Sequence, residues 1–294
     1  MNPIYTIIKK KSRLKIILTL FLLLTFISIE NLSAGQSLDT KGTDFWLTYL
    51  PNFHNSDNNL LDYYDSLYIF ITSDIPTSGI IEYYDSSGQK YTQNFNITDV
   101  TQMYIFKVWY NTFELLGYNE SGNIVNGIRN QSEMIAKQSF HVTSKDEVTV
   151  YAHDQAVLTS DAFLVLPTDI LGDDYFVMSY NSDGTSTVRG INGQSTPSQF
   201  AIVATLDSTV ITIMPTDETE YNGTNTQTIT LNTGQVYLVQ ARISSGNLRS
   251  DLTGTEIHST NPIAVFGGHQ RARIPVNNSA LNSRDCLIEE MSPT

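Results

Sequence analysis

The side chains best suited by type to do chemistry are two histidines at the ends of apolar runs. His269 directly follows Gly267 and Gly268, and His153 with Asp154 occupies the corresponding place earlier in the chain. Because glycine gives the backbone conformations that are closed to other residues, one interpretation is a loop that contacts a ligand. The other, which we favour, is a structural turn whose histidine is satisfied by backbone groups. These five residues are the loop candidates for binding, and the sequence assigns no other binding residue.

A nucleophile with its base can also be imagined from His269, Asp285 and Cys286. A catalytic triad is recognised by geometry, and no family-independent spacing joins these three positions. We therefore predict no catalytic residues and no enzyme activity.

Two groups of aspartates have the ligand type that calcium prefers. They are Asp57, Asp62 and Asp65, and then Asp169, Asp173 and Asp174. Calcium binds carboxylates and carbonyls on loops, but neither group has the spaced acids, the glycine and the distal glutamate of an EF-hand. The sequence therefore predicts no metal site and no cofactor, with calcium as the alternative.

The composition limits the classes of partner that the protein could bind. The chain has 294 residues, 40% of them hydrophobic, one cysteine and a formal net charge of −13. This acidity argues against nucleic acid, since binding nucleic acid requires basic groups that neutralise phosphates. A single cysteine excludes an intrachain disulfide framework and a multi-cysteine zinc site.

Residues 1–34 have the layout of a secretory signal peptide. A basic segment over 9–15 is followed by an apolar run over 16–29 and by a small residue, Ala34. The run is shorter than the roughly 20 residues of a spanning helix, although a short membrane anchor is the alternative. We expect no permanent membrane span after cleavage, a secreted or cell-surface location, and a linker over 35–43.

The rest of the chain predicts strands. Short apolar or alternating runs, such as 67–71, 200–205 and 210–214, are separated by turn residues. Several short strands at regular spacing are typical of an all-β protein. Within 112–137 one helical turn could form near Phe113.

An internal repeat organises these strands. Val148, Val150 and Tyr151 match Ile263, Val265 and Phe266 at an offset of 115. We place unit one at 44–173 and unit two at 174–294. Each unit has enough strands for two four-stranded blades of a β-propeller or, as the alternative, for one β-sandwich of a tandem pair.

Three segments carry a resemblance to a known family. They are Gly42-Thr43-Asp44-Phe45-Trp46, the stretch from Ser160 to Pro167 that runs into 175–180, and the stretch from Asp251 to Thr255 followed by 262–269. Together they resemble the N-terminal domain of the IgGFc-binding protein family, in a secreted, Bacteroidetes-like bacterial form that stops early at its C-terminus. The resemblance implies an extracellular module without catalytic activity.

Three functions stay open on this basis. The first is a non-catalytic binding or adhesion module for a protein or glycan ligand, which could come from a host. The second is a glycosidase-like enzyme on a β-propeller, which needs two acids about 5–10 Å apart in one cleft. The third is a structural spacer that presents a C-terminal domain. The ligand, immunoglobulin binding and the oligomeric state cannot be derived from the residues.

Overall fold

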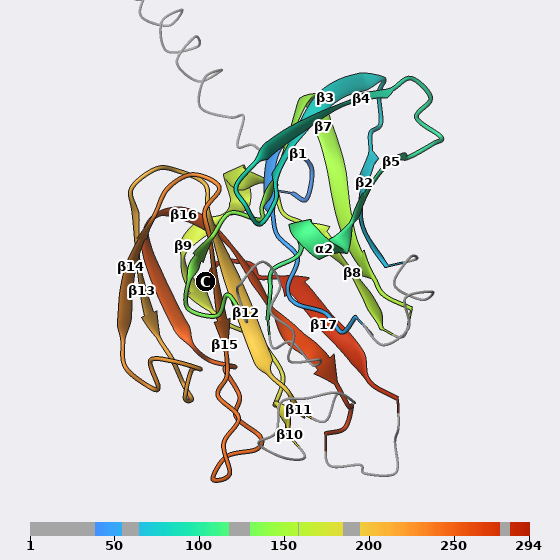
Figure 1. Cartoon of the computed structure of the whole chain (residues 1–294). Coiled ribbons are helices and arrows are strands. Elements are labelled where there is room, and N and C mark those ends of the chain that lie inside the picture. Colours follow the sequence, from blue (N-terminus) through green and yellow to red (C-terminus); the bar gives the residue numbers. More distant parts are fainter. Residues whose placement is uncertain (1–38, 55–64, 118–129, 158, 185–194, 277–282) are drawn as a thin grey trace, which may run out of the picture. The chain divides into compact units, whose positions relative to one another are not determined.

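The computed structural model describes residues 39–54, 65–117, 130–157, 159–184, 195–276 and 283–294. The predicted signal peptide, residues 1–34, lies outside these ranges. Asp39–Thr294 forms one compact unit, and Figure 1 shows it as an assembly of strands. The all-β prediction is confirmed. No helix among the described residues is long and apolar enough to cross a membrane.

The first half of the unit contributes one sheet of seven strands and short helical turns. The elements are β1 (Gly42–Leu47), β2 (Ser66–Thr72), β3 (Thr77–Tyr84), β4 (Lys90–Ile97), β5 (Tyr104–Trp109), α2 (Tyr110–Phe113), β6 (Ile135–Ala136), β7 (Phe140–Gln155), β8 (Ser160–Val165) and the 3-10 turn η2 (Thr168–Ile170). The helical turn expected near Phe113 is α2. Of these strands, β6 joins the sheet of the second half by pairing with β15.

The second half contributes a sheet of eight strands and a two-stranded sheet. The elements are β9 (Gly172–Phe176), β10 (Asp183–Gly184), β11 (Ser195–Thr196), β12 (Ser198–Ala204), β13 (Thr209–Met214), β14 (Gln227–Leu231), β15 (Val236–Gln240), β16 (Glu256–Ala272) and β17 (Asp285–Glu290). Two strands begin before the predicted boundaries: β1 starts inside the predicted linker, and β9 starts before residue 174. The repeat boundaries themselves stay a prediction.

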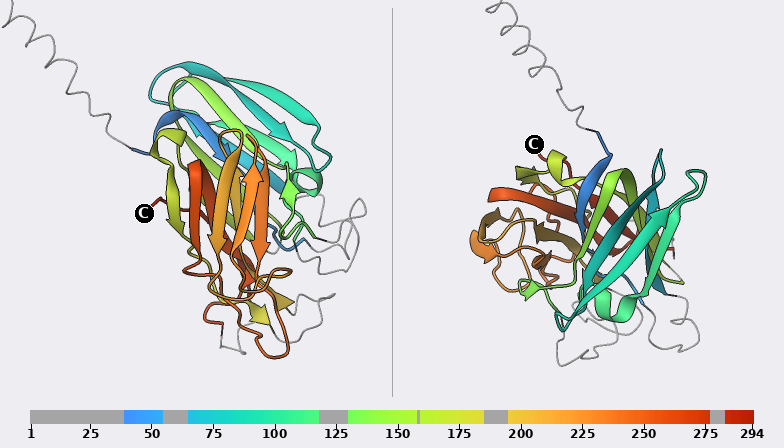
Figure 2. Two further views of the ribbon diagram at one scale, coloured as in Figure 1. Left: turned by 90° about the vertical axis from the view of Figure 1, so that its left-hand side faces the viewer. Right: turned by 90° about the horizontal axis from the view of Figure 1, so that it is seen from above.

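One long strand organises each sheet. The N-terminal part of β7 pairs with β1 and β3, and its C-terminal part pairs with β2 and β8. The strand β16 pairs in the same way with β9, β13, β12 and β17. Because the long strand is shared, each sheet curls into two layers (Figure 2). This arrangement fits the tandem-sandwich alternative better than separate four-stranded blades.

Equivalent strands of the two halves pair with their long strand in the same register. Gly42 lies opposite Val148, and Gly172 lies opposite Ile263, which is Val148 at the offset of 115. Phe70 lies opposite Tyr151 just as Ala201 lies opposite Phe266. In both halves a register shift interrupts the pairing of the first strand with the long strand. Equivalent positions of the two halves can therefore be compared residue by residue.

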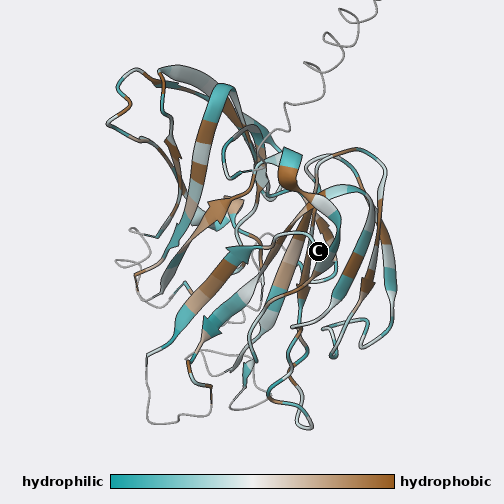
Figure 3. Cartoon of the chain, turned by 180° about the vertical axis from the view of Figure 1, so that it is seen from behind, coloured by the Kyte–Doolittle hydropathy of each residue, from teal (hydrophilic) through white to brown (hydrophobic). Residues whose placement is uncertain are grey.

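The two halves bury their equivalent strands differently. In β2 buried and partly buried residues alternate, as a half-buried strand requires, and bands of opposite hydropathy follow the strands in Figure 3. By contrast, β12 and β15 are buried at every position. One face of this second-half layer packs inside its own half, in a core that contains Phe200 and Ile202. Its other face, which contains Ala201, Leu238 and Phe266, belongs to the hydrophobic core of the first half.

Prediction from the repeat: Phe266→Ala and Tyr151→Ala remove aromatic rings at equivalent positions of the two halves but should change the free energy of unfolding by unequal amounts. Phe266 is fully buried, whereas Tyr151 is 44% exposed. We expect Phe266→Ala to lower the free energy of unfolding by about 3–5 kcal/mol, as truncation of buried aromatic residues does. Tyr151→Ala should lower it by less than about 1 kcal/mol. Urea denaturation of the two variants measures both values, and equal losses would contradict the packing.

Candidate functional site

The five predicted binding residues lie in strands, so their prediction as loop residues is wrong. Gly267, Gly268 and His269 lie within β16, and His153 and Asp154 lie within β7. The glycine pair permits a close backbone approach and makes no turn. A Cβ atom on Gly267 would stand 2.1 Å from the carbonyl oxygen of Met178, and one on Gly268 would stand 1.9 Å from that of Leu287.

His269 is inaccessible to a ligand. Its side chain is fully buried, and its Nδ1 accepts a hydrogen bond of 2.9 Å from the backbone N–H of Arg271. Burial lowers the pKa of His269 to about 3, and the charge of Arg284 acts in the same direction. The imidazole is therefore neutral at physiological pH and serves the packing of β16.

His153 belongs to an exposed face of the first-half sheet. Its ring lies 5.9 Å from the ring of Tyr68 and 6.3 Å from that of Phe70, measured between centroids. Tyr68 and Phe70 lie nearly parallel, 5.8 Å apart, and Lys107 Nζ stands 5.3 Å from the centre of the Tyr68 ring. We call this surface the outer aromatic face. It consists of Tyr68, Phe70, Ile105, Lys107, Trp109, Tyr151, His153 and Leu164, on β5, β2, β7 and β8.

The outer aromatic face is open to solvent. Ile105 is 55% exposed, Trp109 57% and Tyr151 44%. The equivalent face of the second half contains Ala201, Leu238 and Phe266, and all three are fully buried against the first half. A contiguous apolar surface of this kind on a folded protein marks an interaction site more often than a scattered hydrophobic residue does.

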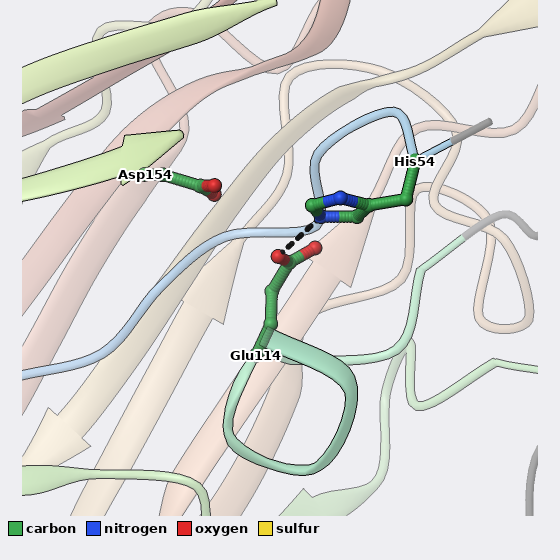
Figure 4. Close-up of side chains that lie close together, drawn as sticks. All are labelled: His54, Glu114 and Asp154. Carbon is green, nitrogen blue, oxygen red and sulfur yellow. Dashed lines mark hydrogen bonds and ion pairs between the residues drawn. The ribbon is translucent and has the colours of Figure 1, made fainter. Parts of the chain in front are cut away.

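Asp154 faces the opposite way, into a buried polar cluster. The cluster joins Asp154 to His54, which follows β1, and to Glu114, which follows α2 (Figure 4). Asp65, just before β2, completes it. Asp154 is 2% exposed, and the side chains of Asp65, Glu114 and His54 are 2%, 6% and 10% exposed.

Hydrogen bonds fix the orientation of each group. His54 Nδ1 lies 2.8 Å from Asp65 Oδ2, and His54 Nε2 lies 2.7 Å from Glu114 Oε2. Asn52 donates its backbone N–H to Glu114 Oε1 at 2.7 Å and its side-chain Nδ2 to Asp154 Oδ1 at 3.1 Å. The ring of Tyr110 stacks on the His54 ring at 3.5 Å between centroids. The cluster thus ties the segment after β1 to α2, β2 and β7.

The electrostatics of the cluster follow from three acids around one base. Burial opposes a charge on His54, but the carboxylates of Glu114 and Asp65 outweigh it and raise the pKa of His54 to about 10. Burial and the neighbouring Glu114 carboxylate raise the pKa of Asp154 well above its usual range.

Sequence reasoning missed His54, Glu114 and Asn52 because no local motif joins them. Asp65 was grouped with Asp57 and Asp62 in the alternative of a calcium-binding loop, and Asp57 and Asp62 lie outside the described residues. In the described part of the chain, His54, Glu114 and Asp154 are the one group of metal-ligating side chains that approach closely. The aspartates at 169, 173 and 174 are exposed and are not part of it.

The imagined nucleophile does not assemble. His269 lies opposite Leu287 across β16 and β17, so the neighbouring Cys286 points to the other face of the sheet. Cys286 is buried, and burial raises the pKa of its thiol well above the usual range. Asp285 Oδ1 instead accepts hydrogen bonds from Thr159 Oγ1 and the backbone N–H of Ser160.

Among the described residues of the first half, two surface cavities can be compared with an active-site cleft. One, of about 330 Å³, is lined by residues 96–99 and 102–105 and has Asp99 as its carboxylate. The other, of about 400 Å³, lies between β3, β4 and β7 and is lined by no carboxylate. Neither cavity has the paired acids that glycoside hydrolysis requires.

Comparison with known proteins finds a family match over the C-terminal part of the chain. Residues 161–294, from β8 to the last described residue, match the family described as IgGFc binding protein. Over this stretch, the chain is similar to the IgGFc-binding family. The resemblance to this family is confirmed there, and the bacterial origin and early stop stay predictions.

The other comparisons add little to this assignment. No curated protein matches the chain. Among solved structures, the N-terminal CBM22-1–CBM22-2 tandem domain of Xyn10C from Paenibacillus barcinonensis aligns at 11% identity over 72% of this chain and 73% of its own, with a TM-score of 0.15. This likeness is too weak to support an argument about fold or ligand.

Prediction for the cluster: His54→Ala should destabilise the protein strongly. It removes the one base and leaves three buried carboxylates without an opposite charge, which costs about 3–5 kcal/mol. Denaturation by urea at pH 7 measures the loss. As the matched control, His258→Ala removes a histidine that also faces two carboxylates but is 51% exposed, and it should change little. Similar effects for the two variants would contradict the interpretation.

Prediction for His269: its buried neutral ring should reduce stability in acid. The pKa of His269 is near 6.5 in the unfolded state and about 3 in the folded state. Between these pH values the imidazole is protonated in the unfolded state and stays neutral in the folded state. Stability from this group is complete above pH 6.5 and falls by about 1.4 kcal/mol per pH unit below it. The difference in unfolding free energy between wild type and His269→Gln, followed from pH 7 to 4, should change with this slope. A constant difference would show that His269 titrates normally.

Proposed function

We propose that this protein is an extracellular, non-catalytic binding module that holds a protein ligand on its outer aromatic face. The observation that carries the proposal is the contrast between equivalent surfaces. The second half buries this face against the first half, whereas the first half leaves it exposed, with the rings of Tyr68, Phe70 and His153 in stacking distance of one another.

The chemistry of the face favours a protein as the ligand. Tyrosine and tryptophan give large contact areas at low entropic cost and are enriched in protein interfaces. The same face of the other repeat is already complementary to a protein surface. The net charge of −13 attracts a ligand with basic groups around its apolar contact, because complementary charges steer association.

The family description supports the same class of ligand. It names the Fc part of immunoglobulin G as what its members bind, and a binding family gives no reason to expect catalysis. The described residues agree with this, since the buried thiol of Cys286 and the buried imidazole of His269 are unsuited to nucleophilic chemistry.

Prediction for the ligand: the Fc fragment of immunoglobulin G should bind the purified chain, and a face variant should lose this binding. We expect Tyr68→Ser combined with Phe70→Ser to weaken the affinity at least ~10-fold, since central aromatic residues dominate such interfaces. Interferometry with immobilised Fc measures the affinity.

The matched control is Phe176→Ser, which removes an exposed aromatic ring, 55% accessible, from β9 outside the outer aromatic face. It should bind Fc as the wild type does. The proposal would be rejected if Fc does not bind, if the face variant binds normally, or if a glycan array shows a sugar ligand that depends on Tyr68 and Phe70.

A further inference from the structure

The buried polar cluster has the geometry of a metal centre. One imidazole nitrogen and one oxygen from each of Glu114 and Asp154 lie within 4.8 Å of one another. The three side chains come from separate parts of the first half and point toward a common position (Figure 4). His54 Nε2 and Glu114 Oε2 are the closest pair, at 2.7 Å.

The surrounding hydrogen bonds orient these groups as the outer shell of a metal site does. Asp65 holds His54 Nδ1, and Asp65 Oδ1 in turn accepts the backbone N–H of Val157 at 2.8 Å. A carboxylate on the second nitrogen of a histidine is the usual support for a metal-binding imidazole. Asn52 occupies Glu114 Oε1 and Asp154 Oδ1. These bonds hold the His54 Nε2–Glu114 Oε2 pair close to the Asp154 carboxylate.

Asp154 gives an independent sign that a ligand belongs there. It is 2% exposed, and Asn52 donates a hydrogen bond to its Oδ1. Its carboxylate faces the His54–Glu114 pair from β7 (Figure 4). Buried carboxylates in native proteins are normally paired or coordinate a metal.

The count of charged groups points the same way. Three carboxylates surround one imidazole, and no lysine or arginine among the described residues forms an ion pair with them. A doubly charged cation would balance this excess, which the buried environment otherwise makes unfavourable.

We propose that His54, Glu114 and Asp154 bind a divalent transition-metal ion, for which zinc is the best-matched choice. Imidazole with carboxylate oxygens suits zinc and manganese, whereas calcium and magnesium prefer oxygen ligands alone. Zinc bonds to such ligands are about 2.0–2.2 Å long. The two nearest ligand atoms must separate slightly, and the Asp154 carboxylate must turn inward. The ion would fasten the segment after β1 to α2 and β7, independently of the ligand on the outer aromatic face.

The test measures zinc in the purified chain after dialysis, together with titration calorimetry. We expect one zinc ion per chain and no comparable uptake of calcium. Asp154→Asn, which keeps the acceptor for Asn52, should weaken zinc binding at least ~100-fold, and Asp65→Asn should weaken it about 10–100-fold, as loss of an outer-shell partner does.

His258→Ala is the matched control, because His258 contacts Asp174 and Glu256 at the surface of the second half. It should leave zinc binding unchanged. If the ligand variants do not fold, the wild-type protein is sufficient to test the proposal. Cobalt bound to it should give the visible absorption spectrum of a site with a nitrogen ligand. The NMR signal of His54 Nε2 should shift when zinc binds.

Three results would overturn the proposal. They are the absence of stoichiometric zinc, zinc binding that is lost with His258 but not with Asp154, and zinc binding without a shift at His54. Any of these would leave a shared proton as the only charge compensation inside the cluster. Binding of Fc through the outer aromatic face would be unaffected by that result.

Discussion

The structure depends on a sheet layer that is covered on both faces. The strands β12 and β15, with the C-terminal part of β16, separate two hydrophobic cores. On one side the layer closes its own half, and on the other it fills the interior of the first half with side chains such as Leu238 and Phe266. Since burial of apolar area is the main stabilising contribution to folding, the first half is complete only with the second in place.

Polar contacts at the edge of this interface fix how the halves meet. Strands β8 and β17 exchange hydrogen bonds between side chains and backbone: Glu290 accepts the N–H of Leu166 at 2.8 Å, and Asp161 accepts the N–H of Ile288 at 3.0 Å. Asp285 accepts the N–H of Ser160 at 2.8 Å. Because such bonds are directional, they specify one register where apolar packing alone would tolerate several. The same register decides which face is buried and which stays free.

The alternation of apolar residues was enough to predict the strands and the all-β class, because each half-buried strand shows it locally. It was also enough to relate Tyr151 to Phe266, although not to foresee that one would be exposed and the other buried. That difference arises from contacts between halves, which no local pattern contains. The continuous apolar run of Phe200 to Ala204 was the one available sign that this strand is covered on both faces.

The prediction of the binding residues was wrong for a related reason. Gly267 and Gly268 were interpreted as the end of a strand, whereas the chain uses them where two backbones approach closely in the middle of β16. The His54 cluster was not foreseen because its members are distant in sequence. Asp154 did carry a signal: it continues the inward-facing series Val148, Val150 and Ala152, where an acid needs a buried partner.

The central claim is that equivalent faces of two repeats are buried in one half and free in the other. Hydroxyl-radical footprinting read by mass spectrometry tests it most directly, because it reports the solvent access of individual aromatic rings in the native chain. The account predicts rapid oxidation of Tyr68, Phe70 and Tyr151 and strong protection of Phe200 and Phe266. Oxidation of Phe266 as fast as that of Tyr151 would contradict it.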